Sequence, residues 1–343
     1  MQKKSQLQQK AGRLERGIVI FALILRILTT QAVYAVPGRA IRRLSENSRL
    51  GEMIGSLYSD TDIRQAQKHG GTVTVRRLTK LEPEGLGLLS LPAAEENTPN
   101  IEFVSADVSS IRIIGSCTYA YDAAALLSAP LKVRFSSDAP QVLIVHTHTT
   151  EAYAETEGYS STDPEKNVVA VGNVIAEMLE KNGIPTLHET GLNDVYGYQD
   201  AYERMDTVIA DYLAQYPSIQ MVIDVHRDSF EDSSGNMAGP VVTAGGMECA
   251  KLMLVMGTDE GGLYHPNWQD NLSCALKLQS MLLGTYPSVC RDLLLRQSRY
   301  NQHRTPCSML VEIGASGNTL LQAQNTARLF AEAVSRLILN NTE

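Results

Sequence analysis

Residues 138–343 alternate between short apolar runs and longer amphipathic segments, and this alternation limits the possible folds more than any other feature of the sequence. The apolar runs predict buried strands at 142–145, 184–187, 221–225, 252–257 and 310–313. The amphipathic segments predict helices at 167–181, 201–216, 268–283 and 319–339. Alternating strands and helices form mostly parallel sheets with helices on both faces. We therefore predict an α/β domain over 138–343 with a mostly parallel, twisted sheet flanked by helices.

The first 36 residues have a different character. Basic residues up to Arg16 precede the apolar run IVIFALIL at 18–25, an order typical of a signal-anchor or transmembrane segment with its basic end inside. Arg26 costs about 2.5–3.5 kcal/mol on insertion scales, and eight apolar residues at about −0.3 to −0.6 kcal/mol each recover a similar amount. A retained anchor and a signal cleaved after Ala35 both remain open, and both place the bulk of the protein outside the cytoplasm. A cytoplasmic amphipathic helix is the alternative.

The region between this segment and the α/β domain carries no recognisable chemistry. Residues 37–137 contain charged, helix-like stretches, then short alternating runs such as 72–75 and 111–114, and a polar loop at 91–100. This pattern predicts a small, loop-rich accessory region or stalk with short strands.

Charge and cysteine content exclude some classes of protein. A formal net charge of −8 argues against a nucleic-acid partner, because binding to phosphates requires a basic surface. The five cysteines are an odd number without a C-x-x-C pair, which favours buried free thiols over a zinc knuckle or a complete disulfide framework.

Ionisable side chains follow several of the predicted strands. His146 and His148 come after the first strand, His226 and Asp228 after the third, and Glu312 lies in the last. Carboxyl ends of parallel strands meet at one edge of an open sheet, where active sites usually form. Neutral imidazole and carboxylate groups are suitable zinc ligands. The sequence therefore predicts a metal site at this edge.

The order of these residues resembles a known group of enzymes, the zinc-dependent N-acetylmuramoyl-L-alanine amidases of the type 3 fold. The motifs that carry this resemblance are His148, EKNVV at 165–169, DVHRD at 224–228, and LVEIG at 310–314 followed by Asn318. More closely, the sequence is similar to the family of stage II sporulation protein P. That similarity lies in HTHTTEAY at 146–153, HPNW at 265–268, RYNQ at 299–302 and the basic–apolar N-terminus.

The amidase resemblance implies a specific division of roles. His148, Glu165 and His226 would bind Zn²⁺, and Glu312 would be the catalytic acid and base. Three protein ligands leave a fourth zinc position for water, whose pKa falls toward about 7. Glu312 would accept the water proton and transfer it to the leaving amide nitrogen.

Several assignments stay open at this point. His146 stands where those amidases usually have an acid; if the strand continued, His146 and His148 would share a face, and His146 would replace Glu165 as a ligand. Otherwise His146 would bind substrate or stabilise the transition state, together with Glu151 or Arg227. Asp224 or Asp228 would accept a hydrogen bond from an imidazole. His265 lies in a loop that would contact substrate, whereas His188 and His303 are more typical of surface histidines.

The resemblance also implies a biological role. It implies hydrolysis of the amide between N-acetylmuramic acid and L-alanine of the peptidoglycan stem peptide, a further activity on peptide cross-links, and a place in engulfment during endospore formation. The implied partners are stage II sporulation protein D and an engulfment membrane complex. A catalytically silent wall-binding scaffold of the same fold is the alternative, and a zinc peptidase or deacetylase acting on another extracellular polymer is a third.

Overall fold

The computed structural model describes residues 34–37, 72–75, 103–136 and 138–342, with side chains from residue 103 onward. The chain divides into two compact units, Met1–Asn97 and Thr98–Glu343. In the first unit, β1 (Tyr34–Pro37) pairs antiparallel with β2 (Thr72–Val75). The predicted signal-anchor segment lies almost entirely outside the described residues. Within the described part of the chain, no helix is long and apolar enough to cross a membrane.

The second unit is built on a seven-stranded sheet with the order β3-β10-β9-β11-β6-β4-β5. Its neighbouring strands are parallel, except that β9 and β11 run antiparallel. This arrangement confirms the predicted mostly parallel sheet. The strands are β3 (Ile113–Gly115), β4 (Val142–Val145), β5 (Thr186–His188), β6 (Met221–Asp228), β9 (Leu252–Met256), β10 (Leu293–Leu295) and β11 (Met309–Ala315).

The helices lie close to the predicted ranges. The main helices are α6 (Val168–Lys181), α7 (Ala201–Gln215), α8 (Trp268–Thr285) and α9 (Leu320–Leu339), and a shorter α5 spans Ala123–Ser128. The 3-10 helices are η1 (Val108–Ser110), η2 (Glu157–Tyr159) and η3 (Gln302–Arg304). A hairpin of β7 (Val241–Ala244) and β8 (Met247–Ala250) turns at Gly245–Gly246, both with positive φ, as a tight hairpin turn requires.

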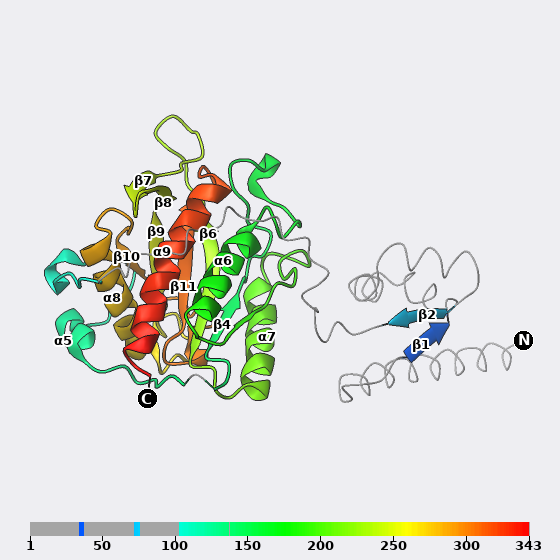
Figure 1. Cartoon of the computed structure of the whole chain (residues 1–343), viewed down its shortest axis with the longest axis horizontal. Helices are drawn as coiled ribbons and strands as arrows, with labels where there is room; N and C mark the ends of the chain where they lie inside the picture. Colours follow the sequence, from blue (N-terminus) through cyan, green and yellow to red (C-terminus); the bar gives the residue numbers. More distant parts are fainter. Residues whose placement is uncertain (1–33, 38–71, 76–102, 137, 343) are drawn as a thin grey trace, which may run out of the picture. The chain divides into compact units, whose positions relative to one another are not determined.

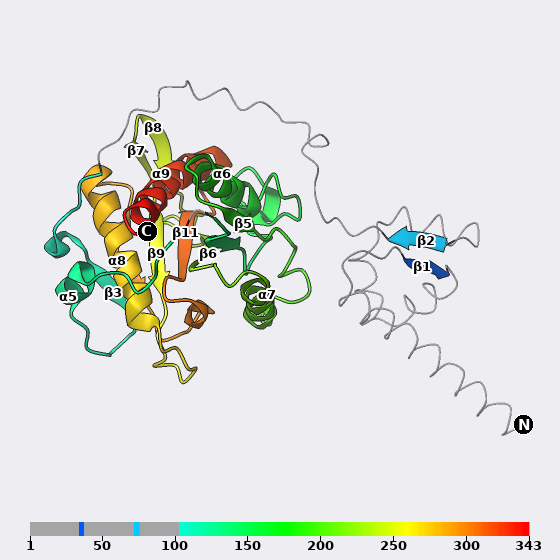
Figure 2. The same cartoon turned by 60° about the horizontal axis from the view of Figure 1, so that its bottom comes forward.

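Helices cover both faces of this sheet (Figures 1 and 2). On β4, Val142 and Ile144 join the large core that includes α6, α8 and α9, whereas Leu143 and Val145 pack with α7. Consecutive side chains on a strand point to opposite faces, so neighbouring residues of β4 pack against helices on opposite sides of the sheet. Burial on both faces explains why the strands read as continuous apolar runs.

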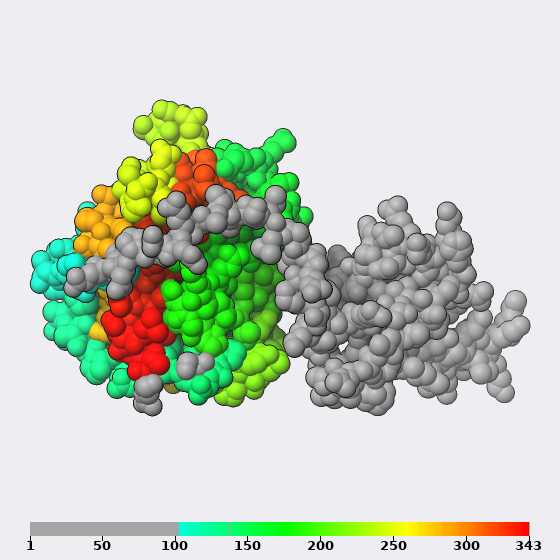
Figure 3. All heavy atoms as spheres, viewed as in Figure 1, coloured from blue at the N-terminus to red at the C-terminus, as the bar shows by residue number. Residues whose placement is uncertain are grey.

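The α/β unit begins earlier in the chain than the sequence suggested. Residues 103–136 were expected to belong to an accessory region, but β3 pairs with β10 at the edge of the sheet, and Phe103 packs edge-on against Tyr286 of the main unit. The segment therefore covers the α8 side of this unit, as the cyan chain beside α8 shows in Figure 3. Three-residue strands that pair with distant partners leave almost no periodic signal, which explains the difference.

The cysteines differ in part from the prediction. Cys274 of α8 forms a disulfide with Cys307, 33 residues later. Cys117, Cys249 and Cys290 are free thiols, and the latter two are buried. The prediction of free thiols was therefore wrong for Cys274 and Cys307, because only the folded chain brings α8 beside the segment that precedes β11.

Candidate metal and catalytic site

Three neighbouring parallel strands place their ionisable residues at one edge of the sheet. β6 lies between β4 and β11, and in this register His226 of β6 is paired with Glu312 of β11. Val145, the last residue of β4, pairs with Asp224. Asp224 and His226 share the face of the sheet that carries Val222 and packs against α7, since residues two apart on a strand point the same way. The α7 face is therefore where the candidate site forms.

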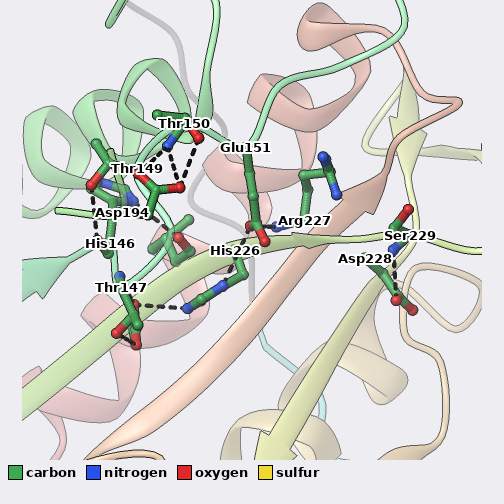
Figure 4. A network of polar contacts seen from close by, with 12 residues as sticks. His146, Thr147, Thr149, Thr150, Glu151, Asp194, His226, Arg227, Asp228 and Ser229 are labelled. Carbon is green, nitrogen blue, oxygen red and sulfur yellow. Dashed lines mark hydrogen bonds and ion pairs between the residues drawn. The ribbon is translucent and has the colours of Figure 1, made fainter. Parts of the chain in front are cut away.

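His226 lies between two carboxylates: that of Asp224, which is buried, and that of Glu151, whose side chain is 13% exposed and is drawn beside His226 in Figure 4. Its Nδ1 is 3.3 Å from Oε2 of Glu151, and its Nε2 is 3.0 Å from Oδ1 of Asp224. Burial alone would lower the pKa of His226, but the negative charges of Asp224 and Glu151 raise it well above its ordinary value. The two carboxylates therefore favour the protonated form of this imidazole.

Each of these carboxylates is fixed by its own hydrogen bonds. The backbone N–H and the hydroxyl of Thr147 donate to Asp224, at 2.8 and 2.6 Å. The backbone N–H of Arg227 donates to Glu151 at 3.0 Å. The guanidinium of Arg227 donates to the carbonyl oxygens of Ala152 and Tyr159, each at 2.8 Å. Arg227 therefore anchors the loop that carries Glu151. Hydrogen bonds within the protein thus hold both carboxylates beside His226 in place.

His148 completes the group from the turn after β4. It is buried, its ring centroid lies 5.4 Å from that of His226, and its Nδ1 has no hydrogen-bond partner in the described part of the chain. Tyr198 stacks on the imidazole with ring centroids 3.9 Å apart, and Tyr202 meets it edge-on at 5.5 Å. Burial lowers the pKa of His148, which favours the neutral imidazole that a metal ion requires.

The two glutamates differ in protonation. Burial, opposed by the nearby His226 and supported by the negative charge of Glu151, raises the pKa of Glu312 to about 8. Burial also acts to raise the pKa of Glu151, but His226 and Arg227 together lower it below the ordinary value. One carboxyl oxygen of Glu312, Oε2, is buried without a partner among the described residues. Divergent pKa values in neighbouring carboxyl groups are typical of acid–base sites, with Glu151 ionised and Glu312 able to hold a proton.

The side chains of this cluster suit a divalent metal ion. Two ligands bound tetrahedrally at about 2.0–2.1 Å lie about 3.3–3.4 Å apart, which matches the 3.3 Å between Nδ1 of His226 and Oε2 of Glu151. The unpartnered Nδ1 of His148 is a third donor. Asp224 behind His226 has the position of the carboxylate that orients a metal-binding histidine. Among the described residues, no group of three or more His, Cys, Asp or Glu side chains is already arranged to hold a metal ion.

Two of the predicted ligands lie elsewhere. Glu165 is exposed, and its backbone N–H donates to Asp163 in the loop before α6. β4 ends at Val145 and the chain turns after His146, so His146 keeps the face of Ile144 and does not share the environment of His148. Its Nδ1 lies 2.9 Å from the carbonyl oxygen of Val225, and its Nε2 lies 2.8 Å from Nε2 of His188. His146 therefore packs on the α6 side of the sheet, where a Cβ on Gly172 would meet its ring.

The remaining predicted residues have structural contacts. Asp228 pairs with Arg291 at 2.5 Å and lies further along β6, beside Ser229 in Figure 4. Asn318 is fully buried; its Oδ1 accepts the N–H of Ala315 at 2.9 Å and fixes the turn between β11 and α9. Both support the ends of the strands that carry His226 and Glu312.

The tyrosines around His148 were not among the predicted site residues. Tyr202 lies in the first turn of α7 and Tyr198 in the loop before it. Tyr300, whose ring centroid is 5.7 Å from that of Tyr202, comes from the loop before η3. Their shared position depends on tertiary packing and has no local signal. Glu151 had one available signal, because it lies three residues after His148 and its N–H donates to the carbonyl of that histidine at 3.3 Å.

Fold and site together define an α/β protein with a buried histidine–carboxylate cluster at the carboxyl edge of its parallel strands. A family model, "Stage II sporulation protein P (SpoIIP)", matches residues 89–335. The chain belongs to this family. It is 28% identical over 222 residues to stage II sporulation protein P of Bacillus subtilis strain 168, a match that covers 59% of this chain and 52% of the relative. The match thus spans about half the length of that curated relative.

Two solved amidase structures have a low structural similarity to this chain. The CwlD amidase from Clostridioides difficile, solved in complex with the GerS lipoprotein, has a TM-score of 0.39 and 14% identity, covering 59% of this chain and 98% of that one. An N-acetylmuramoyl-L-alanine amidase of Nostoc punctiforme has a TM-score of 0.35 and 15% identity, covering 58% and 96%.

Proposed function

We propose that this protein is a zinc-dependent peptidoglycan hydrolase that cleaves the amide between N-acetylmuramic acid and L-alanine of the stem peptide. The observation that carries the proposal is the cluster that the buried His148 and His226 form with Glu151, with Glu312 beside it. A protein that only binds the cell wall has no need of a protonatable carboxyl group placed against such a set of ligands. Membership of the sporulation family supports this substrate class.

The metal-binding assignment is His148, Glu151 and His226, with Glu151 in place of the predicted Glu165. Their donor types are those of zinc hydrolases that use two histidines and a glutamate. The chemistry that zinc supplies in such sites is acidification of water and polarisation of a carbonyl group. Oδ1 of Asp224 lies 3.0 Å from Nε2 of His226 on the side away from Glu151, which favours the ring orientation with its Nδ1 toward the site.

Glu312 carries the proton in this proposal. Its carboxylate accepts a proton from the attacking water and delivers it to the amide nitrogen, which leaves poorly unless it is protonated. The raised pKa of Glu312 places it near the neutral range that such a transfer requires. Tyr202, buried against His148, excludes bulk water from this side of the cluster.

The cellular setting is inferred from the family and the N-terminal sequence. The basic–apolar pattern of residues 1–36 supports a single membrane anchor with the α/β unit outside the cytoplasm. Within this proposal, the protein acts on peptidoglycan during engulfment, together with stage II sporulation protein D and the membrane complex that drives engulfment. Hydrolysis of peptide cross-links is a further activity in the same proposal.

Metal removal tests the proposed chemistry. We expect the full chain, incubated with isolated sacculi, to release stem peptides with a new L-alanine N-terminus while the glycan strands stay intact. A chelator should abolish this release, and added zinc should restore it, because the proposed ligands alone cannot polarise the amide. Mass spectrometry of the soluble products measures both the amount and the cleaved bond. Release that continues unchanged in chelator would rule out the zinc mechanism, and absence of release under all conditions would favour the wall-binding scaffold.

A further inference from the structure

A second group of unpartnered polar atoms lies outside the candidate metal site. His265 is completely buried, yet neither of its ring nitrogens has a hydrogen-bond partner among the described residues. Nε of Arg299 and Nδ1 of His303 are also buried without partners in this part of the chain. Buried polar groups are normally satisfied, so a cluster of unsatisfied polar atoms indicates a missing ligand or ordered water.

The two segments that carry these side chains are fastened together. The side-chain amide of Asn267 donates to the carbonyl oxygen of His303 at 3.1 Å, and that of Asn271 donates to the carbonyl oxygen of Gln302 at 2.7 Å. His265 therefore precedes α8 at the point where the η3 segment crosses it. Burial, together with the nearby His303 and Arg299, lowers the pKa of His265 to about 4. Both residues are therefore close to His265.

The charge in this cluster favours an anion over a metal ion. Asp206 is the neighbouring acid, and it is already paired with Arg304 at 2.5 Å; it also lies 3.6 Å from Nε2 of His303. No ion pair of Arg299 occurs within the described residues, so its positive charge is not balanced by an ion pair there. A fixed cation repels a metal ion, whereas the guanidinium group matches the planar geometry of a carboxylate.

The cluster is connected to the candidate metal site through Tyr202. The side chain of Asn301 donates to the carbonyl oxygen of Tyr202 at 2.7 Å, and Tyr300 contacts the ring of Tyr202. Tyr202 in turn contacts His148. Tyr300 and Asn301 have φ of 50° and 57°, a conformation that costs energy outside glycine, so the loop is held in this position by its contacts. The loop that carries Arg299 and the candidate metal site therefore share Tyr202 as a neighbour.

We propose that His265, Arg299 and His303 form a subsite that binds a carboxylate of the peptide portion of the substrate. The peptide identity of this ligand rests on the proposed function, since stem peptides carry free carboxylates. The role of the subsite is to position the peptide, with the scissile amide at the metal site.

Binding without hydrolysis tests this subsite. The probes are an acetylated peptide of stem-peptide composition with free carboxylates and the same peptide with all carboxylates amidated. They are titrated calorimetrically into the metal-free full chain. We expect the carboxylate form to bind about 10-fold more tightly, in line with a hydrogen bond to a charged group. Arg299→Gln should remove this preference, whereas Arg296→Gln, at an exposed arginine three residues earlier, should retain it.

The outcomes separate this proposal from the proposed hydrolysis. Equal binding of the two peptides by the unaltered protein, or an unchanged preference in Arg299→Gln, overturns the subsite even if sacculi are cleaved. A preference that depends on Arg299 supports it even if no amide is cleaved. His265→Gln provides a second variant, and because His265 is buried, circular dichroism must first show that this variant is folded.

Discussion

Glu312→Gln is expected to lower amide hydrolysis by about 10²–10⁴-fold, the usual contribution of a positioned general acid–base group. Glutamine keeps the size and the hydrogen-bonding atoms of the side chain but cannot accept and return a proton. The buried position of Glu312 beside His226 makes this near-isosteric change the least disturbing one available. The rate of stem-peptide release from sacculi, compared at equal protein concentration, measures the effect.

Zinc content provides the control for this variant. Glu312 is not a proposed ligand, so the variant should bind zinc with the stoichiometry of the unaltered protein. Hydrolysis within about threefold of the unaltered rate would show that another group carries the proton and that Glu312 is not the acid–base residue.

The second large effect is expected at Glu151. Loss of a residue that hydrogen-bonds to a metal ligand lowers metal affinity by roughly 10–100-fold. Glu151→Ala should lower zinc affinity by more than this, because it removes a ligand and leaves His226 with one carboxylate. Hydrolysis should fall in parallel. Glu165→Ala is the matched variant: it removes the same side chain from an exposed position 14 residues later, and it should leave zinc binding and hydrolysis unchanged.

Zinc bound per protein molecule, determined after dialysis at a fixed free zinc concentration, distinguishes the two assignments. Loss of zinc in Glu165→Ala together with retention in Glu151→Ala would restore the ligand set implied by the amidase resemblance. It would also mean that the loop before α6 rearranges around the metal.

Much of the fold was accessible from the sequence because its signals are local. Val142–Val145 is an uninterrupted apolar run bounded by polar residues, and β4 has these same limits. The helix predicted over 167–181 corresponds to α6, Val168–Lys181. By contrast, β10 has only three residues, and β3 joins the sheet through a partner about 180 residues away, so neither has a periodicity that could be read.

The candidate site shows the same division. His148, His226 and Glu312 could be proposed because the carboxyl ends of parallel strands meet at one edge. The choice between Glu151 and Glu165 depends instead on the path of the chain after β4, which hydrophobic periodicity does not determine. His146 shows this most simply: alternation would put it beside His148, but β4 ends at Val145 and the chain turns. The subsite around His265 depends on contacts between segments more than 30 residues apart.

Anomalous diffraction at the zinc absorption edge, from crystals of the protein grown with zinc, tests the central claim most directly. We predict a single strong peak bound by ring nitrogens of His148 and His226 and by a carboxylate oxygen of Glu151, each at about 2.0–2.2 Å, with Glu312 beside the open position. A peak that is coordinated by His146 or Glu165, or the absence of any peak between His148 and His226, would contradict this account.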